Sequence, residues 1–570
     1  MNKKTRQTQE NLSLNRRALL KGLGLFPLLP LLPACQPAIK TLQSVDDLAG
    51  VSPINRLLGD HAPPVFTGDD FTRPHHILWD KQTYIKTLGG LPKPTRKEEL
   101  VIIGGGMSGL MSAYLLRDKK PVILEQARRF GGNAKGETWN GLHYAIGAAY
   151  LIKPETDSGL YKILADLGIV KDWAIKSGGD GHVVVNGKRL ENFWAGNSEP
   201  AHKAVYKKLH DYFLSFINEG GSIFPDYPTD DAKLRQYINT LDQENFKSHL
   251  ERIIGSPLPP HLATLLEHYC YSSLGGSASE ISAAAGINFF AAEFMDVAVF
   301  PGGNAYIAEA LLKHLHRQLP PHHLLPGCLV FSVQTRQDGV LISYIDANNQ
   351  AQSILAEKVI LSCPKFVAAK LIDDLPAAKS AAIAELEYRA YMVANLLINR
   401  PIAETDYDIY WLGPGKANVD AAAYAKNRGI TDMVNANFSS LDPRKSVLSF
   451  YQAFPYRGGR AELYAPDAHA AMTLKISTQL KNEFYPFYGL TDQDIVDLRL
   501  TRWGHPLPLA AVGLLNRGVV DALRAPIGDR VYFIEQDNWA LPAIETVAAE
   551  AIYWSSVIRQ EGGKSFDRGS

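Results

Sequence analysis

The sequence predicts an α/β protein with parallel strands, and three neighbouring features near residue 100 support this. Leu100-Val101-Ile102-Ile103 is a continuous apolar run, which is typical of a strand buried on both faces. A glycine-rich stretch follows, and residues 107–118 then place apolar side chains at helical spacing. Pro121-Val122-Ile123-Leu124 is a second apolar run. A strand, a turn, a helix and a second strand in this order indicate a parallel βαβ unit.

The turn between the first strand and the helix has the spacing of a phosphate-binding loop. Gly104-Gly105-Gly106-Met107-Ser108-Gly109 fits G-x-G-x-x-G in the required context, after a strand and at the start of a helix. In such a loop Gly104 allows the tight turn, Gly106 lets backbone approach a pyrophosphate, and Gly109 lets the helix pack against the strand. The free N–H groups at the helix start favour the phosphates. The segment therefore predicts a dinucleotide site.

An acidic residue ends the second strand. Glu125 lies about 20 residues beyond the first glycine, where a carboxylate accepts hydrogen bonds from ribose hydroxyls. The same carboxylate repels a 2′-phosphate, so NADP is disfavoured.

The residues after Glu125 resemble the flavin-containing amine oxidase superfamily, which includes monoamine and polyamine oxidases, with protoporphyrinogen oxidase and phytoene desaturase as relatives. Residues 125–133, with their glycine pair, resemble the segment that continues the FAD site of that family. The resemblance continues at residues 146–150, 300–304, 330–333, 359–364, 502–505 and 532–546. It implies non-covalent FAD held by Gly104, Gly106, Met107, Ser108, Gly109, Glu125, Gln126, Gly131, Gly132, Asn133, Gly147, Ala148, Val330, Asp537, Ala543 and Ile544.

The resemblance also implies a fold and a domain organisation. The expected fold is α/β, with a discontinuous Rossmann-type FAD-binding domain and an inserted mixed α+β substrate domain. Residues 98–175, 296–370 and 505–562 are expected to form the FAD-binding domain, and residues 176–295 and 371–504 the substrate domain. Residues 36–97 contain seven prolines and are interpreted as a tether and N-terminal extension, partly packed against the body.

Several positions depart from the family pattern. Asn395 stands where the family has a lysine near the flavin, and Ala543 stands where amine oxidases have a tyrosine of their aromatic cage. Gln536 replaces a glycine of the final strand motif, and Asn133 an arginine. No cysteine lies near the final motif, which argues against covalent attachment of the flavin.

The predicted activity is that of an amine oxidase-like, FAD-dependent oxidoreductase, in which hydride passes from the substrate to flavin N5. The candidate residues at the flavin face are Asn395, Trp503 and His505. Tyr269 and Tyr271 fit either a pocket or a helical core stripe. Two alternatives stay open: a dehydrogenase or desaturase of an apolar substrate that uses a membrane electron acceptor, and a non-catalytic flavin-binding lipoprotein that acts as a partner or assembly factor.

Composition excludes other classes. The 570 residues contain 59 Lys+Arg and 59 Asp+Glu, a balance that argues against a nucleic-acid partner. Four cysteines without a C-x-x-C pair predict no disulfide scaffold and no metal site.

Residues 1–35 have the pattern of an export signal. The stretch from Asn15 to Lys21, with Arg16-Arg17, resembles a twin-arginine signal, and Leu32-Pro33-Ala34-Cys35 resembles a lipobox. The resemblance implies export by the twin-arginine machinery and a lipid on Cys35 that tethers the protein to a membrane. Gln36 after the cysteine favours the outer membrane, with the protein facing the periplasm.

Overall fold

The computed structural model describes residues 51–54, 65–179, 182–413 and 429–565. These described residues belong to one compact unit, and the N-terminal segment with the predicted signal and Cys35 lies outside them. Within the described ranges, every helix is too short or too polar to cross a membrane.

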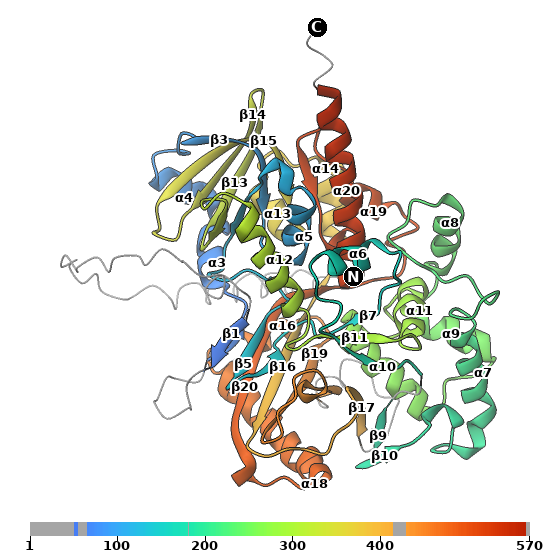
Figure 1. Ribbon diagram of the computed structural model, residues 1–570. Coiled ribbons are helices and arrows are strands. Elements are labelled where there is room, and N and C mark those ends of the chain that lie inside the picture. The colour runs from blue at the N-terminus through green and yellow to red at the C-terminus, as the bar shows by residue number, and fades with distance from the viewer. Residues whose placement is uncertain (1–50, 55–64, 180–181, 414–428, 566–570) are drawn as a thin grey trace, which may run out of the picture. The chain divides into compact units, whose positions relative to one another are not determined.

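A seven-stranded sheet is built around the predicted βαβ unit (Figure 1). Its parallel part contains β12, β4, β3, β15 and β21, and β14 and β13 extend it in antiparallel fashion. The strands are β3 (Arg96–Ile103), β4 (Val122–Glu125), β12 (Leu324–Pro326), β13 (Leu329–Arg336), β14 (Gly339–Ile345), β15 (Ala351–Leu361) and β21 (Val531–Phe533). Strands far apart in the sequence thus share one sheet, which confirms the predicted discontinuous fold.

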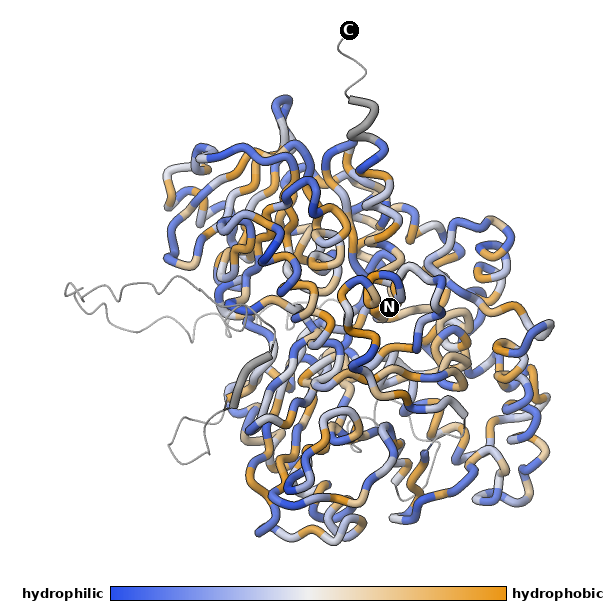
Figure 2. The backbone as a smooth tube through the Cα atoms, in the orientation of Figure 1, coloured by the Kyte–Doolittle hydropathy of each residue, from blue (hydrophilic) through white to orange (hydrophobic). Residues whose placement is uncertain are grey.

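Both faces of β3 are covered, which explains its unbroken apolar run. Leu100 and Ile102 pack with α5 (Met107–Leu115), α12 (Ala305–Gln318) and α20 (Ile544–Ser565), and Val101 and Ile103 pack on the opposite face with β13 and α13 (Lys365–Leu371). None of these four strand residues is more than 4% exposed. Figure 2 shows the hydrophobic residues gathered along the strands and the hydrophilic ones on the outer loops.

A second, eight-stranded sheet has the order β10-β9-β17-β18-β19-β16-β20-β2. Its long central strands are antiparallel, so alternate residues face opposite sides. The strands are β2 (Thr67–Gly68), β9 (Val183–Val185), β10 (Lys188–Leu190), β16 (Tyr388–Ile398), β17 (Asp408–Gly413), β18 (Asp432–Asn435), β19 (Ser446–Phe454) and β20 (Ile495–Pro508). One face carries Tyr391 and Trp503 and packs towards residues 139–149.

Helices between residues 203 and 292 cover part of this face. Their shared core is aromatic, with Phe213, Phe246 and Phe290 in mutual contact. They are α7 (Lys203–Leu214), α8 (Ala232–Leu241), α9 (Phe246–Ile254), α10 (Pro260–Leu274) and α11 (Ala283–Ala292). The stretch between residues 160 and 295 also contains β8 (Ala174–Lys176), β9 and β10, whose runs of three residues are too short to show a period in the sequence.

The remaining elements join these layers. Two three-stranded sheets have the orders β1-β5-β6 and β7-β11-β8. One helix ends at Gln479 and is followed directly by Leu480–Phe484, which is π-helical. The other elements are β1 (Val51–Ile54), β5 (Gly136–Trp139), β6 (Leu142–Ala145), β7 (Leu151–Ile152), β11 (Val297–Val299), α3 (Thr72–Leu78), α4 (Lys81–Thr87), α6 (Gly159–Asp166), α14 (Ala377–Ala384), α16 (Gly459–Leu463), α17 (Ala468–Gln479), α18 (Tyr485–Tyr488) and α19 (Val519–Arg524).

Candidate cofactor and substrate site

The turn after β3 requires glycine for steric reasons. Gly104 has φ +108°, and a Cβ on it would lie 2.5 Å from the carbonyl oxygen of Ser362. A Cβ on Gly109 would lie 1.9 Å from the carbonyl oxygen of Gly104. The first helical turn therefore packs directly on the loop, as the motif predicts.

Two glycine segments meet at the start of α5. Gly106 is the N-cap and supplies no side-chain cap, so the N–H groups of Met107 and Ser108 keep no intrahelical partner. The N–H of Gly131 donates to the carbonyl oxygen of Gly105 at 2.8 Å. A Cβ on Gly132, which has φ +59°, would lie 2.9 Å from the Cα of Gly106. The bare backbone above a helix N-terminus fits a pyrophosphate.

Glu125 braces this turn from the end of β4. Its two carboxylate oxygens accept hydrogen bonds from the N–H of Gly105 and of Ala127, both at 2.7 Å. Burial raises the pKa of Glu125, and the charge of Lys135 and these two N–H groups oppose that rise. Each oxygen keeps a second lone pair for a ribose hydroxyl. The neighbouring Gln126 is exposed.

The segments expected at the flavin lie together. The N–H of Ala148 donates to the carbonyl oxygen of Asn133 at 3.1 Å, and both side chains are exposed. A Cβ on Gly147 would lie 2.1 Å from the same oxygen of Asn133 and 3.5 Å from the Trp503 ring. The Trp503 indole donates to the carbonyl oxygen of Ile146 at 2.7 Å. Trp503 thus belongs to this region.

His505 and Asn395 lie on either side of Trp503. His505 packs on the ring of Phe366, with centroids 4.3 Å apart, and burial lowers its pKa to about 3. Asn395 lies in register with Arg499, whereas Tyr391 lies directly beside Trp503. Asn395 is fully buried and accepts a hydrogen bond from the Ser449 hydroxyl at 2.5 Å. Tyr391 is therefore the residue of β16 closest to Trp503 in register.

The other predicted cofactor residues lie at strand and helix ends. Val330, in β13, is 3% exposed, and its strand follows Cys328, whose N–H donates to the carbonyl oxygen of Glu125 at 2.7 Å. Ala543 and Ile544 stand at the N-terminus of α20. Asp537 is 2% exposed and accepts hydrogen bonds from the N–H of Lys365 at 2.9 Å and from the Tyr388 hydroxyl at 2.5 Å.

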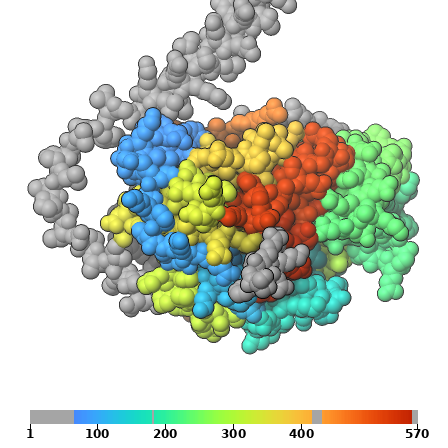
Figure 3. Space-filling view, turned by 90° about the horizontal axis from the view of Figure 1, so that it is seen from above, coloured from blue at the N-terminus to red at the C-terminus, as the bar shows by residue number. Residues whose placement is uncertain are grey.

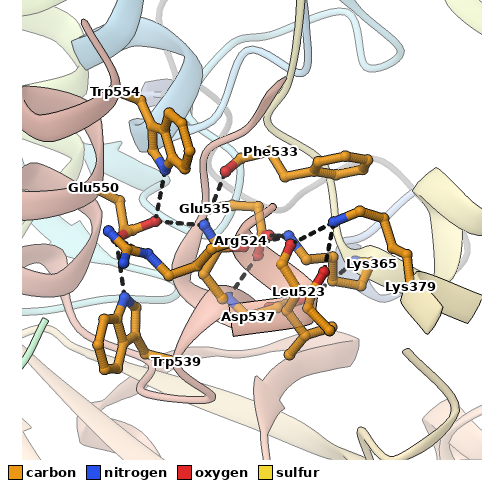
Figure 4. A network of polar contacts seen from close by, with 12 residues as sticks. Lys365, Lys379, Leu523, Arg524, Phe533, Glu535, Asp537, Trp539, Glu550 and Trp554 are labelled. Atoms are coloured by element: carbon orange, nitrogen blue, oxygen red, sulfur yellow. Dashed lines mark hydrogen bonds and ion pairs between the residues drawn. The ribbon is translucent and has the colours of Figure 1, made fainter. Parts of the chain in front are cut away.

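Asp537 belongs to a buried network that the sequence did not indicate (Figure 4). The Lys365 ammonium, which is fully buried, pairs with Glu535 and donates to Asn538. Glu550 of α20 accepts hydrogen bonds from Asn538 and, at 2.9 Å, from the Trp539 indole. The remaining partners of Glu550 are Arg524 and Trp554. Trp539 is held under the Arg524 guanidinium and is 3% exposed, so it forms no open aromatic wall.

Cys363 lies closer to the final motif than the sequence suggests. It follows β15, which pairs with β21, and its thiol therefore lies near Glu535 and Asp537. Burial raises its pKa to about 12, and a protonated thiol is a poor nucleophile. Cys270 and Cys328 are buried. Within the described ranges, no group of three His, Cys, Asp or Glu side chains is placed to hold a metal ion.

A second buried cluster, also missed by sequence reasoning, combines carboxylates with tyrosines. Asp408 and Asp432 lie on adjacent strands and share one face, because Tyr410 stands opposite Asp432 and two residues from Asp408. They are 4% and 3% exposed. Burial raises the pKa of both, that of Asp408 to about 7 against the opposing charge of Lys176. The charge of Asp408 also raises the pKa of Asp432, and both carboxylates raise the pKa of Tyr410.

Helix residues complete this acid–tyrosine cluster. The hydroxyl of Ser272, from α10, donates to Asp432 at 2.9 Å and bonds the Tyr391 hydroxyl at 2.7 Å. Glu293, after α11, accepts hydrogen bonds from Tyr150 and Tyr269, both at 3.1 Å, and its side chain is 17% exposed. Of the two tyrosines left open by the sequence, Tyr269 thus serves the cluster, and Tyr271 packs in the core.

The cluster adjoins the flavin-side segment. The Tyr451 hydroxyl, whose strand position faces Asp432, donates to the carbonyl oxygen of Gly147 at 3.5 Å. The Tyr407 hydroxyl donates to the carbonyl oxygen of Ala149 at 3.1 Å. The acid–tyrosine cluster therefore adjoins the segment of residues 147–149, and of the two only the glycine segments carry a local sequence motif.

Comparison with known proteins agrees with this geometry. A family model described as an NAD(P)-binding Rossmann-like domain matches residues 102–167, which include α5, β4 and α6. The chain is 23% identical to the oxidoreductase PigB of a Serratia species over 552 residues, which cover 85% of this chain and 80% of PigB.

Solved structures show the same fold. A variant of putrescine oxidase superposes with TM-score 0.60 at 16% identity, over 82% of this chain and 100% of the other. A fatty acid isomerase from P. acnes, which produces CLA, superposes with TM-score 0.57 at 14% identity, over 82% and 99%. The fold is therefore flavin amine oxidase-like, as predicted, and the chain is similar over most of its length to an oxidoreductase.

Proposed function

We propose that this chain is an FAD-dependent oxidoreductase that oxidises an amine. The observation that carries the proposal is the position of the acid–tyrosine cluster, which joins Gly147 through the Tyr451 hydroxyl. A turn that suits a pyrophosphate and a cluster of acids that suits a cation then belong to one fold, and the cluster adjoins Gly147. The similarity to an oxidoreductase and to the fold of putrescine oxidase supports this reading.

The residues around the glycine turn suit non-covalent FAD. Gly106, Gly132 and the first turn of α5 would face the pyrophosphate, and Glu125 would accept the ribose hydroxyls. Gly147 and Ala148 would face the flavin beside Trp503. When bound, the flavin supplies the hydride acceptor.

The buried carboxylates give this chain a way to bind and deprotonate an ammonium group. Burial of both acids disfavours their ionising together, although the charge of Lys176, which pairs with Glu293 at 3.9 Å, opposes the rise in the pKa of Asp408. An incoming ammonium would add a second positive charge beside the two acids and favour their ionised forms. Because burial raises the pKa of Asp408 to about 7, its carboxylate accepts a proton near neutral pH. Loss of that proton frees the nitrogen lone pair, which assists departure of hydride from the adjacent carbon.

Anaerobic mixing of purified holoprotein with a panel of primary, secondary and cyclic amines tests the proposal. We expect at least one amine to bleach the flavin absorbance. If the protein retains FAD but no amine bleaches it, the amine assignment is wrong. For an amine that does bleach the flavin, peroxide release in air would distinguish an oxidase from a dehydrogenase.

A second candidate, an oxidoreductase of an apolar substrate, draws support from the likeness in fold to a fatty acid isomerase. The tyrosine-bearing face also contains Val393, Val434 and Val447. Unsaturated fatty acids in the same panel separate the two candidates, because they carry no positively charged group that would pair with the Asp432 carboxylate. Bleaching by the fatty acids alone would favour the second candidate.

We further propose that the protein is exported by the twin-arginine machinery and tethered to a membrane, preferably the outer membrane, by a lipid on Cys35. The support is the sequence pattern of residues 15–36 alone. In cell fractionation, Cys35→Ala should move the protein from the membrane to the soluble periplasmic fraction. Unchanged membrane association of the variant would exclude the lipid as the tether.

A further inference from the structure

Residues 65–87, here called the strap, connect the two large sheets. β2 adds to the edge of the eight-stranded sheet, with Thr67 and Gly68 in register with Thr501 and Arg502. The Thr67 and Thr501 hydroxyls bond at 2.7 Å. Gly68 has φ +103°, and a Cβ on it would lie 2.3 Å from the carbonyl oxygen of Arg502. Only glycine permits this approach, so the strap is fitted to β20.

The first attachment of the strap encloses Arg502. The guanidinium carbon lies 4.9, 4.8 and 4.4 Å from the ring centroids of Phe66, Phe71 and Tyr464. Asp69 accepts hydrogen bonds from the N–H of Gly504, at 2.8 Å, and from the Tyr464 hydroxyl. A guanidinium among three rings, with a carboxylate beside it, is a firm attachment. It lies one residue from Trp503, at the flavin end of the site.

The second attachment lies at the ribose end. The Arg73 guanidinium donates to the carbonyl oxygens of Gly327 at 2.7 Å, and of Ile345 and Asp346 at 2.9 Å. Gly327 in turn donates its N–H to Ala127 at 2.8 Å, two residues after Glu125. α4 then lies on the β13 and α13 surface, where Lys81 pairs with Asp373 at 2.6 Å. Figure 3 shows this early part of the chain, in blue, against the yellow residues that follow β13.

Lys135 connects the strap with the cofactor residues. Burial lowers its pKa, and the negative charges of Glu125, Asp69 and Asp70 oppose that shift. Its ammonium also lies 6.0 Å from the Trp503 ring centroid. Asp69 and Asp70 of the strap and Glu125 at the ribose end therefore all act on Lys135. The strap thus runs beside the dinucleotide site.

We propose that the strap is a retaining element for FAD, fixed at Arg502 near the flavin and by Arg73 near the ribose. This inference rests on the proposed FAD site. A cofactor without a covalent bond is held only as long as its surroundings stay closed, and the strap joins the two segments that must separate for release. Its residues are thus positioning residues for the cofactor.

The test is the rate at which FAD leaves the full-length holoprotein, followed by the rise of free-FAD fluorescence after dilution. Arg73→Met removes three hydrogen bonds, and we expect release to accelerate about tenfold. Asp69→Asn, at the other attachment, should act in the same direction. Arg400→Met is the matched control, because Arg400 also donates to two carbonyl oxygens, at 3.1 and 2.6 Å, but at the far end of β16.

Hydrogen exchange gives a readout that is independent of the variants. We expect amides in residues 72–87 to exchange more slowly in the FAD-bound protein than in the apoprotein. Equal exchange in both forms, together with wild-type release from Arg73→Met, would overturn the proposal. A protein that never takes up FAD would instead refute the proposed function, so the two failures are distinguishable.

Discussion

The two halves of the site are built in opposite ways. The dinucleotide part of the cofactor half is a continuous segment from Ile103 to Asn133, and its contacts are made mainly by backbone N–H groups and glycines. The substrate half draws side chains from β16, β17, β18, β19 and α10, with Glu293 after α11, and its polar groups are mainly carboxylates and tyrosines. A motif therefore marks the first half and none marks the second. The consequence is that substitutions in the two halves should separate cofactor binding from substrate reactivity.

The largest effect is expected at the helix–loop contact. Gly109→Val would place side-chain atoms where only 1.9 Å separates a Cβ from the Gly104 carbonyl oxygen, so the loop must open and FAD binding is lost. Gly286→Val is the matched control, because a Cβ there meets the Phe246 ring at 2.2 Å, outside the cofactor half. Both variants should unfold at lower temperature, but only the first should purify without flavin. Full FAD content in Gly109→Val would show that the glycine turn does not hold the cofactor.

Glu125→Gln should weaken FAD binding by about 10- to 100-fold. The carboxylate accepts two charge-assisted hydrogen bonds from backbone N–H groups, and in the variant the amide NH2 group would face one of these N–H groups and repel it. Flavin titration of the apoprotein measures the effect. Glu99→Gln, at a side chain that is 48% exposed, should bind FAD as the wild type does. Equal affinity in both variants would show that Glu125 does not shape the turn.

Asp432→Asn should retain FAD and reduce the rate of flavin bleaching by a reactive amine by about 100-fold, since a buried ammonium loses its partner. Asp442→Asn, whose carboxylate pairs with Arg444 at 3.4 Å, is the control outside the acid–tyrosine cluster. Stopped-flow absorbance under anaerobic conditions gives the rate. Wild-type bleaching by Asp432→Asn would place substrate recognition elsewhere.

The pH dependence of stability tests Asp408, which belongs to the substrate half. Burial raises the pKa of Asp408 from its ordinary 3.8 to about 7, so between these values the folded chain holds a proton that the unfolded chain has released. The contribution of Asp408 to stability is thus present below about pH 4 and is lost as the pH rises towards 7. In Asp408→Asn this loss is absent, and its Tm relative to wild type should rise between pH 4 and 7. A constant difference would contradict the shifted pKa.

The smallest effect is expected at Trp503. Trp503→Phe keeps an aromatic side chain, although a smaller one, and loses the hydrogen bond to the Ile146 carbonyl oxygen, which contributes about 1 kcal/mol. We expect a small shift of the flavin absorbance maximum and near-normal FAD content. Trp173→Phe, which changes a ring packed on Phe300 at 5.7 Å, should leave the spectrum unchanged.

The same contrast explains what the sequence could predict. The strand ending at Ile103, the turn and Glu125 follow from local spacing, because their partners lie within a few residues or at a fixed offset. Asp408 and Asp432 sit in short strands on either side of residues 414–428, and only strand pairing brings them to one face. Asp432 meets Ser272 across 160 residues, a proximity that no local pattern encodes.

Departures from the family pattern gain meaning only from the fold. Asn395 aligned with a flavin-side lysine, yet the strand register places Tyr391 beside Trp503 and leaves Asn395 opposite Arg499. Trp539 lies close in sequence to Ala543, which stands at the place of the cage tyrosine, yet its indole N–H donates to the buried Glu550. Register and burial, which depend on packing between distant segments, decide which side chains face the site.

The most direct test of the account is one experiment on three proteins: FAD content, followed by anaerobic bleaching with the most reactive amine, for wild type, Gly109→Val and Asp432→Asn. The account predicts flavin and bleaching in the wild type, no flavin in Gly109→Val, and full flavin with strongly slowed bleaching in Asp432→Asn. Flavin in Gly109→Val, or equal bleaching of Asp432→Asn and wild type, would contradict the division of the site into a glycine half and an acid–tyrosine half.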